Sequence, residues 1–298
     1  MRVLVTGSRG LVGYHVAEAF RESPSYQVFL TGRGEAPIPD LPYRSADLTD
    51  RTEVRALLAW AQPDAVIHSA AMTLVDACQE NPALCWQHNV YATYLLVQSL
   101  TEMGAKAQLV FVSTDFVYDG YPIEKRPYVE GDYEAPVSIY GATKLAAEAW
   151  VKTYPGPWAI ARTALVYGWA PTLPRDNILL RVLKQLRQGQ PISLFADQVR
   201  TPSWAGDVAQ GLRLLVEKRA QDLYHIAGPD IESPFSFGQK VARVWGLPTE
   251  LVVGITEEDL RLTAPRPPYS PLSIEKARAL GYAPHDTETV LQRLRSQV

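Results

Sequence analysis

The sequence predicts an α/β protein with a doubly wound parallel sheet and a smaller second domain interleaved with it toward the C-terminus. Short apolar runs alternate with longer amphipathic segments through the first half, and a glycine-rich turn directly follows the first run. Beyond about residue 165, prolines separate segments of helical periodicity. Strands that alternate with helices need crossover connections, which make the strands parallel within one sheet.

Five short apolar runs are expected to form the buried strands of this sheet. They are rich in β-branched residues, and continuous apolarity over such short lengths suits strands that are covered on both faces. The runs occupy residues 3–5, 28–30, 65–67, 109–112 and 158–161.

The helices between these runs have recognisable starts. Asp50, followed by Glu53, is a capping-box-like signal that opens a helix through about residue 61. Asn81 and Pro82 supply a cap and a proline at the first helical position. A glycine is expected to end that second helix about six turns later.

The second half alternates helices with proline-rich connections. The helices are expected at 177–188, 205–218, 236–245, 274–280 and 287–296. The run 223–228 still has the character of a strand and is expected to return to the first sheet. The chain therefore divides into residues 1–165 and, mainly, residues 166–298.

Composition excludes several classes of protein. The chain has 298 residues, and 29 Lys and Arg against 32 Asp and Glu give a formal net charge of −3. This balance argues against a protein that coats nucleic acid, and no apolar run approaches the roughly 18 residues of a membrane span. The first residues show no signal peptide. We therefore expect a soluble, cytoplasmic protein without nucleic-acid or membrane partners.

The glycine-rich turn predicts a dinucleotide-binding site. Glycines stand at a Gly-x-x-Gly-x-x-Gly spacing after the first strand, at the start of a helix expected over 11–23. The first glycine would form the tight turn, the second would admit a pyrophosphate, and the third would let the helix pack closely on the sheet. The candidate cofactor-binding residues are Gly7, Ser8, Arg9, Gly10, Leu11, Val12 and Gly13. A purely structural strand-to-helix turn is the alternative.

The end of the second strand bears on which cofactor binds. An NAD site usually has an acidic residue there that accepts from the ribose 2′-hydroxyl. This chain has Arg33, which can hold a 2′-phosphate through its guanidinium group. NADP(H) is therefore favoured, with NAD(H) as the alternative if Arg33 is only a solvated loop residue.

A tyrosine followed four residues later by a lysine occurs twice. Tyr121 and Lys125 lie in a turn-rich loop, where the helical relation does not hold. Tyr140 and Lys144 lie in a strongly helical stretch and share one face. The ammonium group is expected to lower the pKa of Tyr140 toward neutrality, as proton transfer by a phenol requires. The alternative for Lys144 is a surface pair with Glu148.

Polar side chains follow the apolar run 109–112. In an open parallel sheet, ligands bind beyond the C-terminal ends of the strands. Thr114 is therefore placed to hydrogen-bond a substrate carbonyl, and Asp115 to contact substrate hydroxyls. Both side chains could instead satisfy loop backbone.

Together these motifs resemble the extended short-chain dehydrogenase/reductase superfamily, and several segments resemble its dTDP-4-dehydrorhamnose reductase family. Residues 113–120, Ser-Thr-Asp-Phe-Val-Tyr-Asp-Gly, closely match that family's Ser-Thr-Asp-Tyr-Val-Phe-x-Gly run. The similarity covers nearly the whole chain. The sequence departs from the family at Leu165, where tryptophan is common, and at Met72, where an aromatic residue is usual.

The resemblance implies a role for each candidate residue. Tyr140 would donate a proton, Lys144 would hold the nicotinamide ribose, and Thr114 would orient the carbonyl. Further cofactor contacts would come from Asp47, Leu48, Ala70 and Ala71. Arg200 and Arg266 are candidates for the substrate diphosphate, with salt bridges as the alternative.

The implied function is NADPH-dependent reduction of the 4-keto group of a nucleotide-activated deoxysugar. One alternative is a nucleotide-sugar epimerase or dehydratase, against which Arg33 counts because those enzymes typically have an acidic residue after the second strand. Another is a dinucleotide-binding regulatory subunit without catalysis, as in methionine adenosyltransferase.

Two further features concern assembly and thiol chemistry. Trp86, Tyr94 and Trp150 lie on predicted helices, where they could form either a homodimer face or part of the core. Cys78 and Cys85 are the only cysteines, too few for a disulfide framework or a cysteine-based metal site, and we expect buried thiols and no metal.

Overall fold

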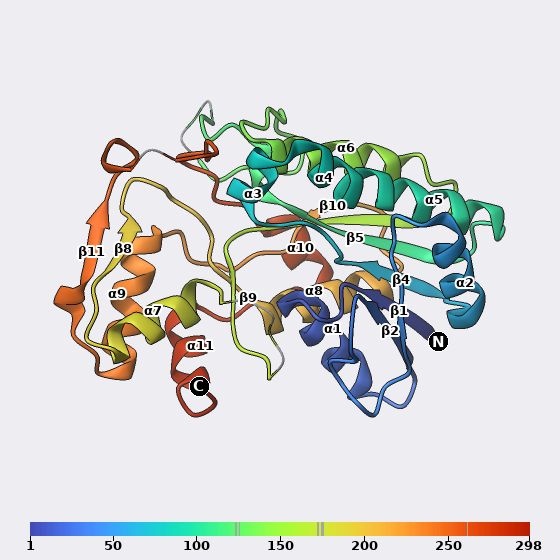
Figure 1. Ribbon diagram of the computed structural model, residues 1–298, viewed down its shortest axis with the longest axis horizontal. Helices are drawn as coiled ribbons and strands as arrows, with labels where there is room; N and C mark the ends of the chain where they lie inside the picture. Colours follow the sequence, from blue (N-terminus) through green and yellow to red (C-terminus); the bar gives the residue numbers. More distant parts are fainter. Residues whose placement is uncertain (123, 125, 172, 174–175, 261) are drawn as a thin grey trace.

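The computed structural model describes residues 1–298 except 123, 125, 172, 174–175 and 261 (Figure 1). Lys125, one of the two lysines that follow a tyrosine at helical spacing, therefore lies outside the described residues. Tyr121 lies in irregular backbone and is 72% exposed. Within the described residues, no helix is both long and apolar enough to cross a membrane.

The core of the fold is a seven-stranded sheet in the order β10-β6-β5-β4-β1-β2-β3. Every neighbouring pair of strands is parallel. The strands are β1 (Arg2–Thr6), β2 (Gln27–Gly32), β3 (Tyr43–Ser45), β4 (Ala65–His68), β5 (Gln108–Thr114), β6 (Trp158–Thr163) and β10 (Asp222–His225). The direction of winding reverses between β1 and β4, and the C-terminal edge at such a reversal is where open α/β sheets bind ligands.

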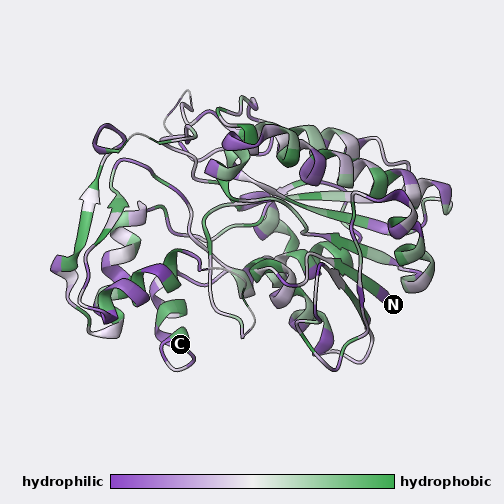
Figure 2. Ribbon diagram, viewed as in Figure 1, coloured by the Kyte–Doolittle hydropathy of each residue, from purple (hydrophilic) through white to green (hydrophobic). Residues whose placement is uncertain are grey.

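Helices cover both faces of the sheet because alternate residues of each strand point to opposite sides. Val3 and Val5 of β1 enter one hydrophobic core, and Leu4 enters the other. The first core lies under α1 (Leu11–Arg21) and α8 (Ala205–Glu217), and the second lies under α2 (Arg51–Ala61), α5 (Ala92–Glu102) and α6 (Ile139–Lys152). Figure 2 shows the strands between these two layers as predominantly hydrophobic.

A third core lies beyond the C-terminal side of the sheet. Its helices are α7 (Ile178–Arg187), α9 (Pro234–Trp245) and α11 (Thr287–Leu294), packed with the strand pair β8 (Ile192–Phe195) and β11 (Val252–Ile255). A second strand pair, β7 (Val166–Tyr167) and β9 (Ser203–Trp204), lies where the chain passes between the two parts. Helix α10 (Glu275–Leu280) packs near β10, so the chain leaves the sheet and returns to it repeatedly (Figure 1).

The structure refines two expected helix starts. Asp50 caps α2 by accepting from the backbone N–H groups of Thr52 and Glu53, at 2.7 and 3.1 Å. The capping box is not completed, because the Glu53 carboxylate accepts from the backbone of Asp47 instead, at 2.7 Å. The expected long helix after residue 81 contains three segments: α4 (Pro82–Trp86), a π-helical turn at Gln87–Tyr91 and α5. The short helix α3 (Val75–Glu80) was not expected.

Candidate active site

The glycine turn forms a close-packed cradle at the end of β1. Gly7 has a φ of +67°, and a Cβ on this residue would lie 2.7 Å from backbone atoms of Ala70. A Cβ on Gly13 would collide with the carbonyl group of Gly7. Gly10 caps α1, and its N–H donates to the Gly7 carbonyl at 2.9 Å. Side chains at Gly7 and Gly13 would prevent the first turn of α1 from packing against the loop. Because the glycines allow this close packing, the cradle fits a dinucleotide pyrophosphate at the start of α1.

The other residues of the turn differ in where they point. The N–H and hydroxyl of Ser8 both donate to the carbonyl of Thr31 at 3.1 Å, so Ser8 fastens the turn to β2 and its hydroxyl is already engaged. Arg9 extends over the loop after β2, where its guanidinium donates to the carbonyl of Arg33. Leu11 and Val12 are the half-buried first residues of α1.

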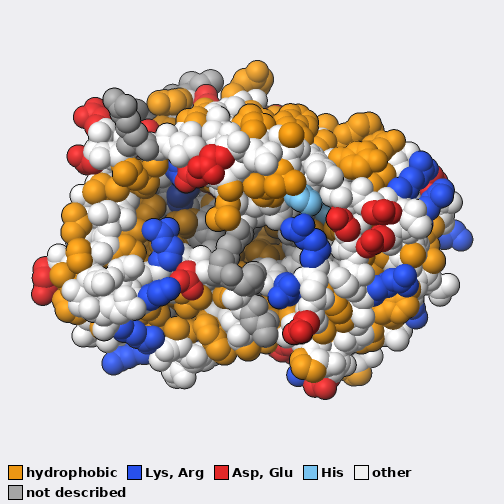
Figure 3. All heavy atoms as spheres, viewed as in Figure 1, with side chains coloured by type: hydrophobic (Ala, Val, Ile, Leu, Met, Phe, Trp, Pro, Cys, Tyr) orange, Lys and Arg blue, Asp and Glu red, His pale blue; other side chains and the backbone are white. Residues whose placement is uncertain are grey.

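Two basic residues, Arg33 and His88, lie near Asp47, which follows β3. Backbone hydrogen bonding from Thr49 lowers the pKa of Asp47, and the nearby charges of His88 and Arg33 lower it further. Leu48 beside it is buried in the second core. His88, from the π-helical turn, was not found from the sequence because its proximity to Arg33 depends on long-range packing. Figure 3 shows a hollow on this face of the molecule with Lys, Arg and His side chains around its rim.

The strand next to the cradle is tied to it by buried polar groups. The His68 ring contacts the hydroxyls of Thr6 at 2.8 Å and Thr93 at 3.0 Å, and burial lowers its pKa to about 3, so it is neutral. The N–H of Ala70 donates to the Thr6 hydroxyl at 3.3 Å. Ala71 follows as a half-buried residue. The backbone of these two alanines thus forms one wall beside the glycine turn.

The first residues of α6 bring Tyr140 to the end of β5. The Ser138 hydroxyl caps the helix by accepting from the N–H of Gly141 at 3.2 Å. A Cβ on Gly141 would collide with the carbonyl of Phe116, so glycine here lets α6 approach the turn after β5. The Thr114 hydroxyl consequently interacts with the phenol of Tyr140. Sequence spacing located Tyr140 and Lys144, but it did not reveal this approach.

Burial dominates the electrostatics of the Tyr140 and Lys144 pair. It raises the pKa of Tyr140, against a lowering by the hydrogen bond with Thr114. Burial also lowers the pKa of Lys144 to about 7, against raising contributions from Glu148 and Cys85. The expectation that Lys144 brings the pKa of Tyr140 down toward neutrality is therefore wrong for the protein by itself. A phenol that keeps its proton is the form that a proton donor needs.

Lys144 is not a surface residue paired with Glu148. It is 3% exposed, and its ammonium nitrogen lies 4.0 Å from the centre of the Phe111 ring. Glu148 lies one helical turn further, fully buried, and its carboxylate is held by the hydroxyl of Ser113 at 2.5 Å and by Arg162 at 2.6 and 2.9 Å. This buried carboxylate–guanidinium pair fixes α6 to β5 and β6.

Asp115 is engaged with the second half of the chain. Thr114 donates to its carboxylate at 3.2 Å, Ser270 donates to it at 2.5 Å, and Arg200 lies 3.4 Å away. Burial raises the pKa of Asp115, against the nearby charge of Arg200. Arg200 is 3% exposed, so its salt bridge is buried, in contrast to the surface salt bridge considered from the sequence.

Arg266 is also paired. Its guanidinium makes a bidentate contact with Asp76 at 2.7 and 3.1 Å and donates to the carbonyl of Ala264 at 2.7 Å. Arg200 and Arg266 lie close enough that the charge of Arg266 contributes to lowering the pKa of Arg200, whose main cause is burial. The two arginines thus converge, but each already has a carboxylate partner.

The fold and the site define a class of protein. A glycine cradle at the reversal point of a parallel sheet, with a threonine at the end of β5 and a Tyr-x-x-x-Lys pair on α6, is the arrangement of a Rossmann-type, nicotinamide-dependent short-chain dehydrogenase/reductase. Among the described residues, no group of three or more His, Cys, Asp or Glu gathers as a metal site would require.

The chain belongs to the family described as "RmlD substrate binding domain", whose model matches residues 1–297. It is 33% identical, over 92% of this chain and 90% of the relative, to the probable low-salt glycan biosynthesis reductase Agl14 of Haloferax volcanii. It is 29% identical to methionine adenosyltransferase 2 subunit beta of Rattus norvegicus, over 94% of this chain and 82% of the relative. The family resemblance expected from the sequence is therefore confirmed.

Solved structures give the same result for the fold. A dTDP-4-dehydrorhamnose reductase of Clostridium acetobutylicum has a TM-score of 0.87 and 25% identity, over 100% of this chain and 99% of that one. A dTDP-4-dehydrorhamnose reductase of Bacillus anthracis, solved in complex with NADP, has a TM-score of 0.84 and 25% identity over the same shares. These likenesses confirm the predicted doubly wound α/β fold.

Proposed function

We propose that this protein is an NADPH-dependent reductase that converts the 4-keto group of a nucleotide-activated deoxysugar to a hydroxyl group. The observation that carries the proposal is the buried contact of Thr114 with Tyr140 at the end of β5, with Lys144 one helical turn further along α6. A substrate screen that follows the absorbance of reduced nicotinamide tests it. We expect turnover with 4-keto nucleotide sugars, and no turnover with any of them would contradict the proposal.

The chain's own residues would position the substrate and supply a proton. NADPH, when bound, supplies the hydride. The Tyr140 hydroxyl, protonated because of its burial, would donate its proton to the carbonyl oxygen as negative charge develops there. The Thr114 hydroxyl, which donates to the Asp115 carboxylate at 3.2 Å, would exchange that acceptor for the same carbonyl oxygen. Lys144 would hold the nicotinamide ribose, and an anionic ligand nearby would favour its charged form.

We propose that the preference for NADP over NAD depends on Arg9 and Arg33, the two arginines at the loop after β2. The Arg9 guanidinium donates to the backbone carbonyl of Arg33, which brings the Arg9 side chain to the same loop as Arg33, and we propose that both guanidinium groups would bind a 2′-phosphate there. We also propose that residues 1–165 bind the cofactor and that residues 166–298 mainly bind the substrate, apart from β10. Arg200 and Arg266 would serve a diphosphate only by exchanging their carboxylate partners for it.

Replacing Arg33 by alanine is expected to weaken NADPH binding and to leave NADH binding unchanged. A lost charge-assisted contact costs about 1.5–3 kcal/mol, which is a fall of roughly 10- to 100-fold in the preference for NADPH. Fluorescence titration with both cofactors measures the ratio. The control is Arg51→Ala, which removes an exposed arginine paired with Glu102. An unchanged ratio in Arg33→Ala would remove the argument for NADP.

Cofactor affinity is expected to fall as the pH rises above about 7. Burial has already lowered the pKa of Lys144 to about 7, so its charge is lost over this range unless a ligand restores it. The titratable groups that interact with Lys144 are Glu148, the neutral His68 and the Cys85 thiol, whose own pKa is about 7 and whose thiolate raises the pKa of Lys144. Titrations of NADPH above pH 7 should show this fall in the native protein and in neither Lys144→Met nor Lys144→Arg. The same slope in Lys144→Met would contradict the assignment.

The second candidate function is a dinucleotide-binding regulatory subunit, which the similarity to methionine adenosyltransferase 2 subunit beta favours. Such a protein would bind cofactor without turnover, and a Tyr140→Phe variant would keep its partner. The complete Thr114, Tyr140 and Lys144 set supports the reductase, because a subunit that only binds has no need of a proton donor. We further propose a cytoplasmic location, since a chain of 298 residues with only two cysteines does not have the disulfide framework that is common in small secreted proteins.

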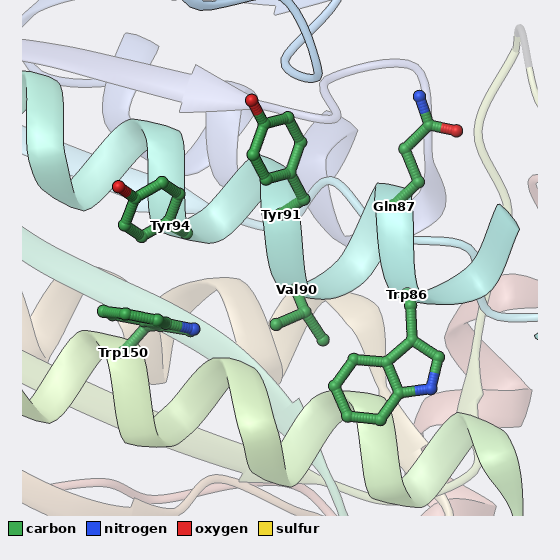
Figure 4. Close-up of a pocket in the computed structure, with 6 residues that line it drawn as sticks. All are labelled: Trp86, Gln87, Val90, Tyr91, Tyr94 and Trp150. Carbon is green, nitrogen blue, oxygen red and sulfur yellow. The ribbon is translucent and has the colours of Figure 1, made fainter. Parts of the chain in front are cut away.

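An exposed aromatic patch is proposed to pair two copies of the chain. Trp86, Tyr91 and Trp150 are 43%, 46% and 37% exposed. Figure 4 shows how the side chains from α4, the π-helical turn, α5 and α6 surround a shallow pocket lined by Trp86, Gln87, Val90, Tyr91, Tyr94 and Trp150. A twofold axis would bury each such patch against its copy. Sedimentation should show a dimer that Trp150→Glu dissociates, and a monomeric native protein would contradict this.

A further inference from the structure

Both cysteines of the chain lie together beside the proposed proton donor. Cys78 is on α3 and Cys85 is on α4, and both are 0% exposed. They pack in one cluster with Tyr140. Every other residue of these two short helices is half-buried or exposed, so the two thiols lie only one layer of side chains below the surface.

The two thiols are in contact with each other and with polar groups. Cys78 and Cys85 share a hydrogen bond, and the single thiol proton of Cys78 has the carbonyl of Met72, at 3.6 Å, as its alternative acceptor. The Cys85 sulfur accepts from the side-chain amide of Asn89 at 3.3 Å and lies 3.4 Å from the hydroxyl of Thr143. The Asn89 amide can therefore donate to a Cys85 thiolate, whereas the Thr143 hydroxyl donates its proton to the carbonyl of Tyr140.

The surroundings also favour the reactive form of Cys85. The hydrogen bond from Cys78 lowers the pKa of Cys85 to about 7, and the positive charge of Lys144 contributes to this lowering. A thiolate fraction is therefore present at neutral pH. A thiolate is the nucleophilic form of cysteine, and a neighbouring second thiol is what resolves its oxidation product.

We propose that Cys78 and Cys85 form a reversible disulfide when the protein meets a peroxide, and that this disulfide suppresses the activity of the adjoining site. The activity part of this proposal rests on the proposed reductase function, whereas the disulfide part does not. Buried thiols are usually inert, but a small peroxide needs only a local opening of α3 or α4 to reach this pair.

The chemistry balances with hydrogen peroxide as the oxidant. The Cys85 thiolate attacks one peroxide oxygen, the O–O bond breaks, and the leaving hydroxide takes up a proton to become water. Cys85 is then a sulfenic acid. The Cys78 sulfur attacks the Cys85 sulfur, the S–S bond forms, and the departing hydroxide takes the thiol proton of Cys78. Two thiols and one peroxide give one disulfide and two waters, with two electrons passing from sulfur to oxygen. A dithiol reverses the change.

The disulfide would disturb the site through its immediate contacts. An S–S bond of about 2.05 Å is much shorter than a hydrogen-bond contact between thiols, so α3 and α4 must move together. Cys85 would lose its role as acceptor for Asn89 and its contact with Thr143, whose hydroxyl donates to the carbonyl of Tyr140 at 2.8 Å. Tyr140, which belongs to the same buried cluster as the two cysteines, would be displaced when they move.

The test begins with a peptide map after graded hydrogen peroxide. A glutamate-specific protease cuts after Glu80, which lies between the two cysteines, so the fragments separate in the reduced protein and stay joined in the oxidised one. Turnover is measured on the same samples before and after a dithiol. We expect joined fragments, a fall in kcat of about tenfold or more from displacement of the proton donor, and recovery on reduction.

The matched control is Cys78→Ser, which removes the resolving thiol but keeps a hydrogen-bond donor beside Cys85. It should keep the activity of the untreated protein, form no joined fragments and accumulate a sulfenic acid that dimedone traps. Separate fragments at every peroxide concentration would overturn the proposal. Joined fragments with unchanged turnover would overturn its regulatory part. The map needs no substrate, so an absence of reductase activity in the reduced protein would count against the proposed function and not against the disulfide.

Discussion

A Tyr140→Phe variant is expected to lose about 10²–10⁴-fold in kcat, because general acid catalysis by a positioned side chain contributes roughly this factor. The substitution removes only the hydroxyl that interacts with Thr114. Its ring would still pack against Phe116 and the two cysteines, so the fold and NADPH affinity should stay as they are. Steady-state rates and NADPH titrations measure the two effects separately.

The control for this variant is Tyr121→Phe. Tyr121 has the same spacing to a following lysine but is 72% exposed in irregular backbone, and its substitution should leave kcat unchanged. Equal activity in Tyr140→Phe and the native protein would show that the proton comes from elsewhere.

Removing the guanidinium of Arg162 is expected to cost about 3–5 kcal/mol of stability, because it leaves a buried carboxylate unpaired. Arg162 and Glu148 are both fully buried and share two hydrogen bonds, and Arg162 also donates to Tyr118 at 2.7 Å and to Glu134 at 2.8 Å. Arg162→Leu would therefore leave the buried carboxylate of Glu148 without its cationic partner. Urea unfolding followed by circular dichroism measures the loss.

The double variant Arg162→Leu/Glu148→Leu distinguishes the stability lost through an unpaired buried charge from the stability lost through altered packing. It should recover part of the stability, since replacing both partners of a buried pair by apolar residues is often close to neutral. A single variant as stable as the native protein would contradict the assignment of this pair as the joint between α6 and the sheet. The control is Arg55→Ala, which removes an exposed partner of Glu102 and should change little.

Much of the fold could be predicted because strands buried on both faces leave a continuous apolar signal. Five apolar runs gave β1, β2, β4, β5 and β6, and the run at 223–228 contains most of β10. The short pairs β7 with β9 and β8 with β11 were missed, since strands of two to four residues carry too little periodicity. The π-helical turn at Gln87–Tyr91 was also missed, because a π-turn has no local sequence signature.

The site was predicted in its residue types but less well in its electrostatics. Glycine spacing and the Tyr-x-x-x-Lys pair are local patterns, and both lie where strand and helix order placed them. The pKa of Tyr140 is raised, whereas the sequence led us to expect a lowered value, because burial outweighs the effect of a neighbouring charge. The burial of a side chain depends on the whole fold and could not be predicted from local spacing. The partners of Arg200 and Arg266 are Asp115 and Asp76, which are distant in sequence and could be paired only in three dimensions.

The central claim is hydride transfer from NADPH to a sugar carbonyl. Its most direct test is to incubate the protein with a 4-keto deoxysugar nucleotide and with NADPH that carries deuterium in the transferred position. The account predicts one NADPH oxidised for each hydroxyl formed, with deuterium at C4 of the product. A cofactor that stays bound with no net oxidation would indicate an epimerase or dehydratase, and cofactor binding with no change in the sugar would indicate a regulatory subunit. Either result would contradict the account.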